Sequence, residues 1–373
     1  MEYTTLDKIS ENLDSKRKPI TSSDRVEGEI PYYGASGIVD YVKDYIFDES
    51  LLLVSEDGAN LLARSTPIAF SVTGKTWINN HAHVLRFSNE NLQKFVEIYL
   101  NSISLESYVT GSAQPKLNQK MLNGIPIPVV DDSQIEIIVN SVENLKSIIE
   151  LRKQELACLD ELIKARFVEM FGNPVINEKR WRQKSLGEIT TKIGSGATPK
   201  GGKGAYQEEG ITLIRSMNVH NGLFEYRELA HISDEQAAKL DNVAIEENDV
   251  LLNITGASVA RSCVVPNKIL PARVNQHVCI IRCKEYINPV FLNKLLIDDN
   301  YQDLLWSVAG AGATREAITK QQVESLQIIM PPVELQNEFM RFCNQVDKSK
   351  VAVQKALDET QLLFDSLMQQ YFG

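Results

Sequence analysis

The second half of this chain repeats the first half. A shift of 201 residues aligns residues 111–172 with residues 312–373 without a gap. A repeat of this length is that of a whole domain rather than of a short solenoid unit, so the chain is expected to contain two copies of one folding unit. The matched positions include Gly111 with Gly312, Leu117 with Ile318, Leu122 with Val323, Ile125 with Leu326, Ile127 with Ile328, and Phe171-Gly172 with Phe372-Gly373.

The repeat is looser upstream of these stretches. Leu6-Asp7-Lys8-Ile9 resembles Leu186-Gly187-Glu188-Ile189, and His83-Val84 resembles His277-Val278, but the offset drifts from 180 to 194. The loops therefore differ in length between the copies, and each copy is a variable globular part followed by a tail of fixed length. We divide the chain into a first globular domain at 1–130, a central helical spacer at 131–172, a second globular domain at 173–330 and a C-terminal helical spacer at 331–373.

The two tails have the pattern of long helices. Apolar residues recur at alternating steps of three and four, and Gly and Pro are absent from 133–170 and 333–371. Such spacing over about five heptads predicts a left-handed coiled coil. In the first tail the positions are Ile135, Ile138, Val142, Leu145, Ile149, Arg152, Leu156, Leu159, Ile163, Arg166 and Met170. In the second they are Gln336, Phe339, Cys343, Val346, Lys350, Val353, Leu357, Thr360, Phe364, Leu367 and Tyr371.

Both helices belong to one chain and match in length, so pairing within the chain is favoured over homodimerisation. A helix of about 36 residues is about 54 Å long. We therefore predict an antiparallel intramolecular coiled coil with pseudo-two-fold symmetry that joins the two globular domains.

The globular parts are predicted to be α+β units with irregular loops. Short apolar runs bounded by turn residues predict strands, and a longer amphipathic stretch in each copy predicts a helix. The strands are expected at Leu51–Val54, Ile68–Val72, Val84–Phe87 and Ile125–Val130, and at Val250–Ile254, Val278–Ile281 and Leu326–Met330 in the second copy. The helices are expected at Leu92–Ser107 and Pro289–Ser307.

Several loops combine glycine with hydroxyl, amide and basic residues, and they recur in both copies. Glycine allows close backbone approach to DNA, Lys and Arg bind phosphate or guanine, and Gln or Asn can bind adenine. One such loop alone is more often an ordinary turn. The candidate DNA-binding residues are Tyr33, Gly34, Ser36, Lys75, Ser112, Gln114, Lys116, Lys192, Thr198, Lys200, Lys203, Arg215, Thr255, Ser258, Arg261 and Arg315.

Composition limits these expectations. The net charge of −10 excludes a broadly basic surface, so a DNA-binding face must be a local concentration of cations or must be completed by a partner. Five scattered cysteines do not form a disulfide framework, and reduced thiols are favoured over a metal site. No secretory signal or membrane-spanning run is present, so we expect a soluble, cytoplasmic protein.

The order of variable unit, helix, variable unit and helix resembles the specificity subunits of type I restriction–modification systems. The resemblance extends over nearly the whole chain and includes IPYYGASGIVDYV from Ile30, GSAQPKLNQKMLNGIPIP from Gly111, KIGSGATPK from Lys192 and NQHV from Asn275. It implies two target-recognition domains that bind the two halves of a split, asymmetric site in double-stranded DNA, with the coiled coil setting their separation. It also implies two adenine-methylating modification subunits and restriction (translocase) subunits as partners. S-adenosylmethionine, Mg and ATP would bind to those partners, and no cofactor or metal is expected on this chain.

Three alternatives make different demands on the sequence. A methyltransferase would need an Asn/Asp-Pro-Pro-aromatic motif, and Asn288-Pro289-Val290-Phe291 lacks the second proline. His81 and His83 could be metal ligands, but no third ligand is evident, so no catalytic activity is expected. A non-DNA coiled-coil scaffold would not need the paired polar loops. A specificity subunit of another methyltransferase–nuclease system would have the same sequence features.

Overall fold

A computed structural model describes residues 2–111, 114–199, 201–310 and 316–373, with only the backbone of Lys203. The chain divides into two compact units. The first contains Met1–Lys153 and Lys355–Gly373, and the second contains Gln154–Gln354. The two long helices contribute to both units.

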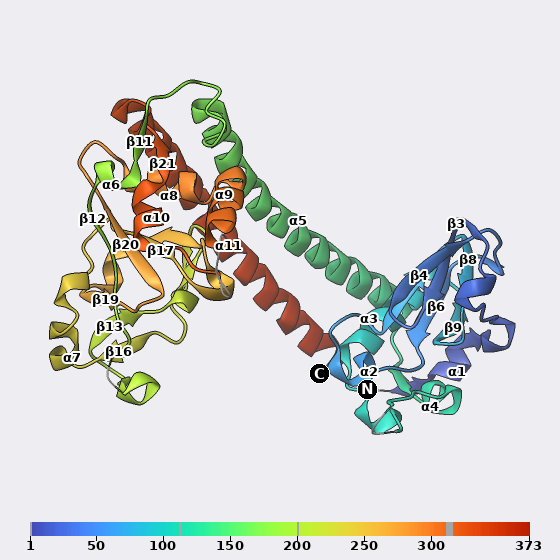
Figure 1. Ribbon diagram of the computed structural model, residues 1–373. Coiled ribbons are helices and arrows are strands. Elements are labelled where there is room, and N and C mark those ends of the chain that lie inside the picture. Colours follow the sequence, from blue (N-terminus) through green and yellow to red (C-terminus); the bar gives the residue numbers. More distant parts are fainter. Residues whose placement is uncertain (1, 112–113, 200, 311–315) are drawn as a thin grey trace. The chain divides into compact units, whose positions relative to one another are not determined.

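The first unit contains two four-stranded sheets (Figure 1). One is antiparallel, in the order β2 (Ser10–Asn12), β9 (Ala82–Phe87), β6 (Leu51–Ser55) and β7 (Ala69–Val72). The other has the order β4 (Gly37–Val42), β3 (Glu27–Gly34), β8 (Lys75–Ile78) and β5 (Phe47–Asp48), with β3 and β8 parallel. A third ladder pairs β1 (Tyr3–Thr5) with β10 (Pro126–Pro128). The predicted strands at 51–54, 68–72, 84–87 and 125–130 are thus confirmed within a few residues.

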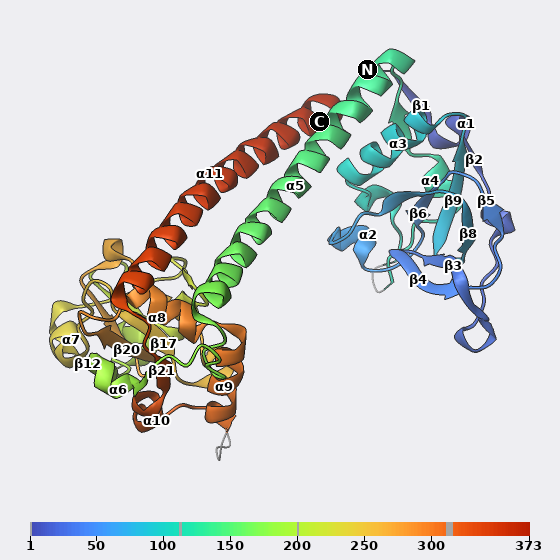
Figure 2. The same ribbon diagram turned by 90° about the horizontal axis from the view of Figure 1, so that it is seen from above.

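Helix α3 (Glu90–Ser102) covers the antiparallel sheet of the first unit (Figure 2). The Asn89 side chain caps it by accepting a hydrogen bond from the Leu92 amide, and Phe95 and Val96 are buried against β6. The predicted helix extended to Ser107, which is wrong. The helix ends at Ser102, whose hydroxyl donates to the Tyr99 carbonyl, and the chain continues in extended conformation at Ile103.

The second unit repeats this arrangement. Its antiparallel sheet has the order β12 (Thr190–Ser195), β20 (Val278–Cys283), β17 (Val250–Asn253) and β18 (Ser262–Val264). Its second sheet has the order β16 (Ala230–Ile232), β13 (Ile211–Ile214) and β19 (Ala272–Val274), with β13 and β19 parallel. The ladder β11 (Gln183–Ser185) with β21 (Gln327–Ile329) matches β1 with β10, and β14 (Val219–His220) pairs with β15 (Leu223–Phe224).

Short helices complete the repeat. In the first unit α1 (Leu6–Ile9) and α4 (Gln119–Asn123) correspond to α6 (Leu186–Ile189) and α10 (Lys320–Ser325) of the second. The remaining short helices are α2 (Asn60–Ala63) and α7 (Asp234–Ala238). The offset of 201 holds for α4, β10 and the two long helices, which confirms the sequence repeat at the level of elements.

The matching helix of the second unit is broken. The prediction of one helix over Pro289–Ser307 is wrong, because the structure has α8 (Pro289–Leu296) and α9 (Asp299–Gly310). The Asp298 carboxylate accepts hydrogen bonds from the amides of Asn300 and Tyr301, so Asp298 starts a new helix instead of continuing the old one.

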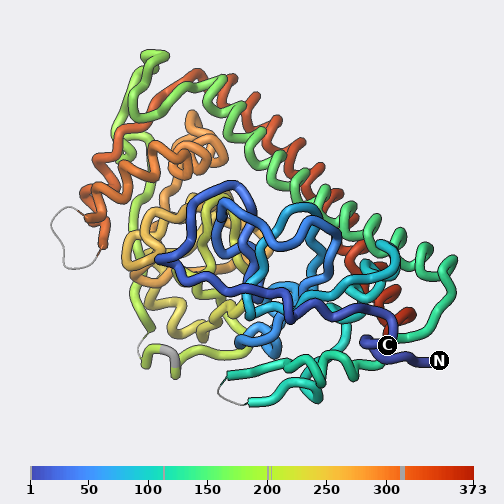
Figure 3. The backbone as a smooth tube through the Cα atoms, turned by 90° about the vertical axis from the view of Figure 1, so that its right-hand side faces the viewer, coloured from blue at the N-terminus to red at the C-terminus, as the bar shows by residue number. Residues whose placement is uncertain are grey.

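The tails are single helices, α5 (Asp132–Phe171) and α11 (Val333–Phe372), each of 40 residues. All the positions predicted from the three–four spacing are buried or half-buried, and none is exposed. The helices lie side by side within each unit (Figure 3). In the first unit the Arg152 guanidinium donates to the Thr360 hydroxyl and the Ala356 carbonyl. In the second unit Asp160 pairs with Lys350 at 2.6 Å, and Arg166 pairs with Glu338 at 3.1 Å.

The ends of the helices belong to the domain cores. Ile135 and Val142 of α5 and Phe372 of α11 pack with Phe95 in the first unit. Phe167 and Phe171 of α5 pack with Phe291 and Phe339 in the second. No helix among the described residues is both long and apolar enough to span a membrane.

Candidate nucleic-acid interface

An Asn–x–His turn follows the parallel strand pair in each unit. Asn79 precedes His81 in the first unit, and Asn275 precedes His277 in the second. In both, the Asn side chain accepts a hydrogen bond from the His amide, at 2.8 and 3.0 Å. The backbone N–H of the Asn donates to a carbonyl near the end of the neighbouring parallel strand, that of Tyr33 or Ile214. The same backbone geometry thus places a histidine at the same end of each unit.

These turns correct the sequence alignment of the repeat. The Glu56 amide donates to the His81 carbonyl, and the Ile254 amide donates to the His277 carbonyl. His81 is therefore the counterpart of His277. The strand register agrees. Val54 and Leu252 lie two residues before Glu56 and Ile254, and they face His83 and Cys279, which lie two residues after His81 and His277. The predicted match of His83 with His277 is wrong by two residues.

The turn gathers most of the predicted loops of the first unit. His81 Nδ1 is 2.9 Å from the Asp57 carboxylate, and the His81 side chain is half-exposed. The Gly58 amide donates to the Pro115 carbonyl, which brings the segment Gln114–Leu117 to the turn. The predicted residues Tyr33, Gly34, Ser36, Gln114 and Lys116 therefore lie at this end, on segments tied to Asn79 and to residues 55–58.

The second unit has a pocket at the equivalent place, with a volume of about 390 Å³. The His277 Nδ1 is hydrogen-bonded to the Thr255 hydroxyl at 2.5 Å, and the Arg261 guanidinium lies 3.4 Å from His220 Nδ1. The Thr198 hydroxyl is hydrogen-bonded to Gln276 of the turn. The pocket offers hydroxyls, an imidazole and a guanidinium, and it is lined by Ser216, Met217, Thr255, Gly256, Ala257, Ser258, Arg261 and His277.

Arg215 lies beside this pocket, immediately before Ser216. Its guanidinium donates to the Glu228 carbonyl and lies over the Tyr206 ring at 5.5 Å. These contacts hold the side chain against its own domain.

Two predicted residues lie away from these turns. Lys75 begins β8, opposite Asp48, and its ammonium is 4.7 Å from the Tyr45 ring centroid. Lys192 lies on β12 opposite Arg282, near the end of β20 farther from His277. Four other predictions cannot be placed: Ser112, Lys200 and Arg315 lie outside the described residues, as does the side chain of Lys203.

Some of the glycines have a structural reason in the fold itself. A Cβ at Gly34 would lie 2.7 Å from Val39 Cγ2, and a Cβ at Gly196 would lie 1.7 Å from the Val274 carbonyl oxygen. The Gly196 amide donates to the Asn275 carbonyl. Glycine at 196 is therefore required for the loop to pack against β19 and the turn, whether or not DNA is bound.

Three titratable groups lie close enough to hold a metal ion, namely Asp14, Glu56 and His83. However, His83 Nδ1 is 2.6 Å from the Asp14 carboxylate, and its Nε2 is 2.7 Å from the Leu117 carbonyl oxygen. Arg17 binds both carboxylates. The group is therefore arranged as a buried ionic cluster, and both histidine nitrogens are already used.

The residues considered for a methyltransferase motif have a structural role. The Asn288 side chain accepts hydrogen bonds from the Val290 and Phe291 amides and so caps α8. The Phe291 ring is buried among Phe167 and Phe171. Neither side chain is available to stack with or bind a base.

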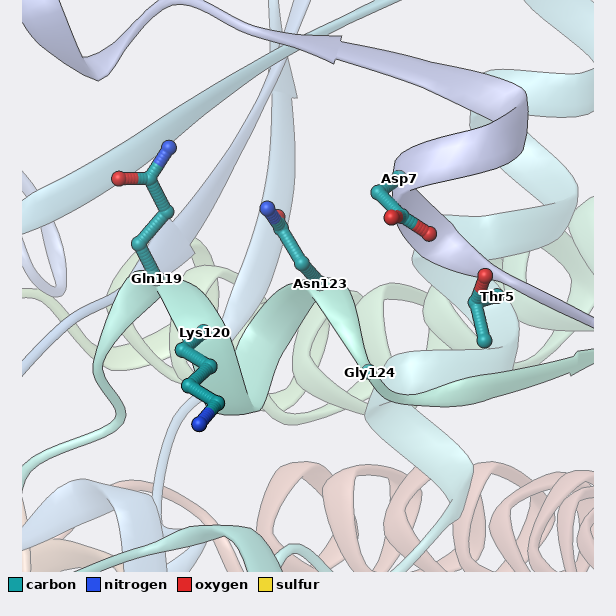
Figure 4. Close-up of a pocket in the computed structure, with 6 residues that line it drawn as sticks. All are labelled: Thr5, Asp7, Gln119, Lys120, Asn123 and Gly124. Atoms are coloured by element: carbon teal, nitrogen blue, oxygen red, sulfur yellow. The ribbon is translucent and has the colours of Figure 1, made fainter.

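A separate cavity of about 460 Å³ lies at the start of the first unit (Figure 4). Gln119, Lys120 and Asn123 reach it from α4, while Thr5 comes from the end of β1 and Asp7 from α1. The Lys120 side chain points away from Asp7 (Figure 4). None of the predicted residues lines this cavity.

Sequence reasoning missed the residues that organise the site. Asn79, Asp57 and Arg17 are not among the predicted residues, and His81 is predicted only as a possible metal ligand. The Arg17 guanidinium donates to the carbonyls of Asn80 and Ala82, which fixes the turn. The sequence signal that could have identified this turn is the Asn–x–His pattern, which precedes an apolar strand in both copies.

Comparison with known proteins agrees with this architecture. The family model of the type I restriction modification DNA specificity domain matches residues 1–161 and 178–360. The chain therefore belongs to the family of type I restriction–modification DNA specificity proteins.

Two relatives show how far sequence similarity extends. A putative type I restriction enzyme specificity subunit of Haemophilus influenzae is 37% identical over 139 residues, which cover 37% of this chain and 36% of that protein. The match thus covers only about a third of the length of that relative. The MjaVIII specificity subunit of Methanocaldococcus jannaschii is 20% identical over 379 aligned residues, covering 92% of this chain and 87% of that protein.

Solved structures show the same fold. The S subunit of the M. genitalium type I restriction–modification system has a TM-score of 0.63 at 13% identity, with 100% of this chain and 96% of that chain covered. A chain from a structural study of type I complex assembly and conformational transition has a TM-score of 0.56 at 15% identity, with 100% and 97% covered.

Proposed function

We propose that this chain is the non-catalytic DNA specificity subunit of a type I restriction–modification complex. Each unit would bind one half of a split, asymmetric site in double-stranded DNA through the end that carries its Asn–x–His turn. The observation that carries this proposal is one backbone arrangement repeated with different side chains. Asp57, Glu56 and Lys116 in the first unit correspond to Thr255, Ile254 and Ala317 in the second.

Different side chains on one scaffold fit the recognition of two different half-sites. Lys116 and Gln114 are exposed in the first unit, and the Thr255–Ser258 segment with Arg261 forms the pocket of the second. A purely structural pair of domains would have no need for different polar groups at this one end.

We further propose that α5 and α11 form an antiparallel intramolecular coiled coil that sets the separation of the half-sites. Burial of the three–four spaced positions in both helices supports this pairing. Within the second unit, Asp160 pairs with Lys350 and the later Arg166 pairs with the earlier Glu338, as antiparallel helices require.

The outward faces of these helices suit partner proteins. Ile137, Leu151 and Leu162 of α5 are 47–60% exposed, and Val351 and Leu362 of α11 are 71% and 69% exposed. The other face of each helix is already buried, so these exposed apolar side chains are suited to contact with partner proteins. Two modification subunits would dock there, and restriction subunits would join them. S-adenosylmethionine, Mg and ATP would bind those partners, and the complex would act on DNA in the cytoplasm.

The test is co-expression with the methyltransferase encoded nearest to this chain, followed by single-molecule mapping of methylated adenines. We expect a split, asymmetric motif that requires both proteins. Methylation by this chain alone would show that it is an enzyme. A folded chain that yields no motif with any candidate methyltransferase would favour a scaffold role. Joint purification with a fused methyltransferase–nuclease would instead assign it to that kind of system.

A further inference from the structure

The first unit contains a buried ionic cluster, and at the positions of its Glu56 and His83 the described part of the second unit has the uncharged Ile254 and Cys279. We call Asp14, Arg17, Glu56 and His83 the His83 cluster. The side chains of Asp14 and His83 are 7% and 1% exposed, and those of Arg17 and Glu56 are 14% and 12% exposed. Arg17 lies 2.5 Å from Glu56, and His83 lies 2.6 Å from Asp14.

Both nitrogens of His83 face acceptors. Nδ1 contacts the Asp14 carboxylate, and Nε2 contacts the Leu117 carbonyl, which can only accept. The ring of His83 is therefore fixed at both ends, by a side chain of one segment and by the backbone of another. The Glu56 carboxylate also lies 3.9 Å from His83, while Arg17 pairs with Asp14 and Lys116 pairs with Glu56.

The His83 cluster holds the segment Gln114–Leu117 at three points. His83 binds the Leu117 carbonyl, Glu56 binds the Lys116 ammonium at 3.1 Å, and the Glu56 carbonyl accepts from the Leu117 amide at 2.8 Å. The segment is also linked to Thr110 through paired backbone hydrogen bonds with Lys116.

The second unit makes the same backbone connection without charges. The Ile318 amide donates to the Ile254 carbonyl, and the Gly256 amide donates to the Glu316 carbonyl. Glu56 is replaced by Ile254, and His83 by the buried Cys279. The scaffold therefore does not require the ionic cluster, and buried ion pairs add geometric definition more readily than net stability.

We propose that His83 is a positioning residue that fixes the segment Gln114–Leu117, and so sets the base preference of the first unit alone. This inference rests on the proposed function, in which that segment faces DNA. His83 itself is buried and acts through the Leu117 carbonyl and through its carboxylate partners.

The variants replace the cluster with the residues that the second unit uses. They are His83→Cys and the double variant His83→Cys with Glu56→Ile, and Cys279→Ala in the second unit is the matched control. Hydrogen exchange on the full chain should show exchange of the Lys116 and Leu117 amides accelerated by about tenfold or more, the loss expected for one buried hydrogen bond. The amides of Ile318 and Gly256 should be unchanged.

Two outcomes would overturn the proposal. One is unchanged exchange at Lys116 and Leu117 in both variants. The other is equal acceleration at the central strand amides of Leu52 and Leu53, since that pattern means general destabilisation of the first unit. Because exchange is measured without DNA, it is independent of the proposed function.

Methylation mapping then tests the consequence for recognition. With the modification subunit present, the double variant should relax the bases in one half of the motif and leave the other half and the spacer intact. Relaxation of both halves, or of neither, would contradict a positioning role limited to the first unit. If the wild-type complex gives no split motif while exchange responds as expected, the proposed function fails and the positioning of the segment stands.

Discussion

His81 and His83 are two residues apart but have different surroundings. His81 is half-exposed beside Asp57, whereas His83 is buried between Asp14 and Leu117. Sequence comparison paired His83 with His277 because valine follows both. Backbone hydrogen bonds pair His81 with His277, because register is set by the strands and not by the next side chain. The sequence therefore predicts which kinds of residue occupy these loops, but it does not predict which residues they contact.

Glycine 196 gives a prediction at this scale. Gly196→Ala should lower the free energy of unfolding by about 3 kcal/mol, because the new Cβ would overlap the Val274 carbonyl and force the backbone to shift. Gly194→Ala is the matched control, since a Cβ there meets nothing within 4 Å. Urea unfolding followed by circular dichroism measures both. Equal stability of the two variants would show that the close approach is not rigid.

Acid should weaken the first unit through its buried carboxylates. Burial favours a higher pKa for Asp14, but hydrogen bonding and charge interaction with His83, together with the Val84 amide and Arg17, hold the pKa below its usual 3.8. The pKa of Glu56 is likewise lowered, since hydrogen bonding and charge interactions with Arg17, His83 and Lys116 outweigh burial. A carboxylate with a lowered folded pKa stabilises the fold above its unfolded pKa, and this is lost as pH falls through the folded value.

The free energy of unfolding should therefore fall as pH is lowered from about 5 toward 3. Asp14→Asn should be less stable at neutral pH by about 3 kcal/mol, since it removes the carboxylate that contacts His83 and Arg17, and should show a shallower fall in acid. Urea unfolding at several pH values measures both slopes. Parallel slopes for Asp14→Asn and the wild type would remove Asp14 as a source of acid sensitivity.

Among the elements, those with one clearly buried face were predictable. In α5 and α11 every position predicted from the three–four spacing is buried or half-buried, because a long helix packed on one side has a fixed apolar period. Val139, Phe167 and Phe171 are also buried but lie outside that spacing. Strands β6 and β17 are predictable because each begins with a run of apolar residues, Leu51–Val54 and Val250–Leu252. Strand β4 was missed because Ile38, Val39 and Tyr41 are exposed and show no alternation.

The break between α8 and α9 gives a prediction about a helix cap. Asp298→Ala should destabilise the second unit by about 1 kcal/mol, because the amides of Asn300 and Tyr301 lose their acceptor. Asp298→Asn keeps an acceptor and is the matched control. Urea unfolding distinguishes them. If both variants lose the same stability, charge rather than capping explains the role of Asp298.

For the whole molecule, exposed apolar side chains on the long helices predict where partners bind. Leu151→Glu and Leu362→Glu should reduce recovery of the modification subunit by about tenfold or more, since each places a charge in an apolar contact. Ile176→Glu is the matched control, because Ile176 is 74% exposed but lies outside both helices. Joint purification measures recovery, and circular dichroism checks folding. Equal loss with Ile176→Glu would point to a general effect of charge.

The separation of the half-sites gives the last prediction. Arg152 contacts Thr360, and Asp160 contacts Lys350, so deleting 153–159 together with 351–357 removes one heptad from each helix and keeps both contacts in phase. The deletion shortens each helix by about 10 Å, which corresponds to roughly three base pairs of DNA. Methylation mapping should return the same half-sites with a shorter spacer. A control deletion of 153–159 alone breaks the register and should prevent assembly of an active complex. An active double-deletion complex with the original spacer would mean that the helices do not set the distance, and that the partner subunits do.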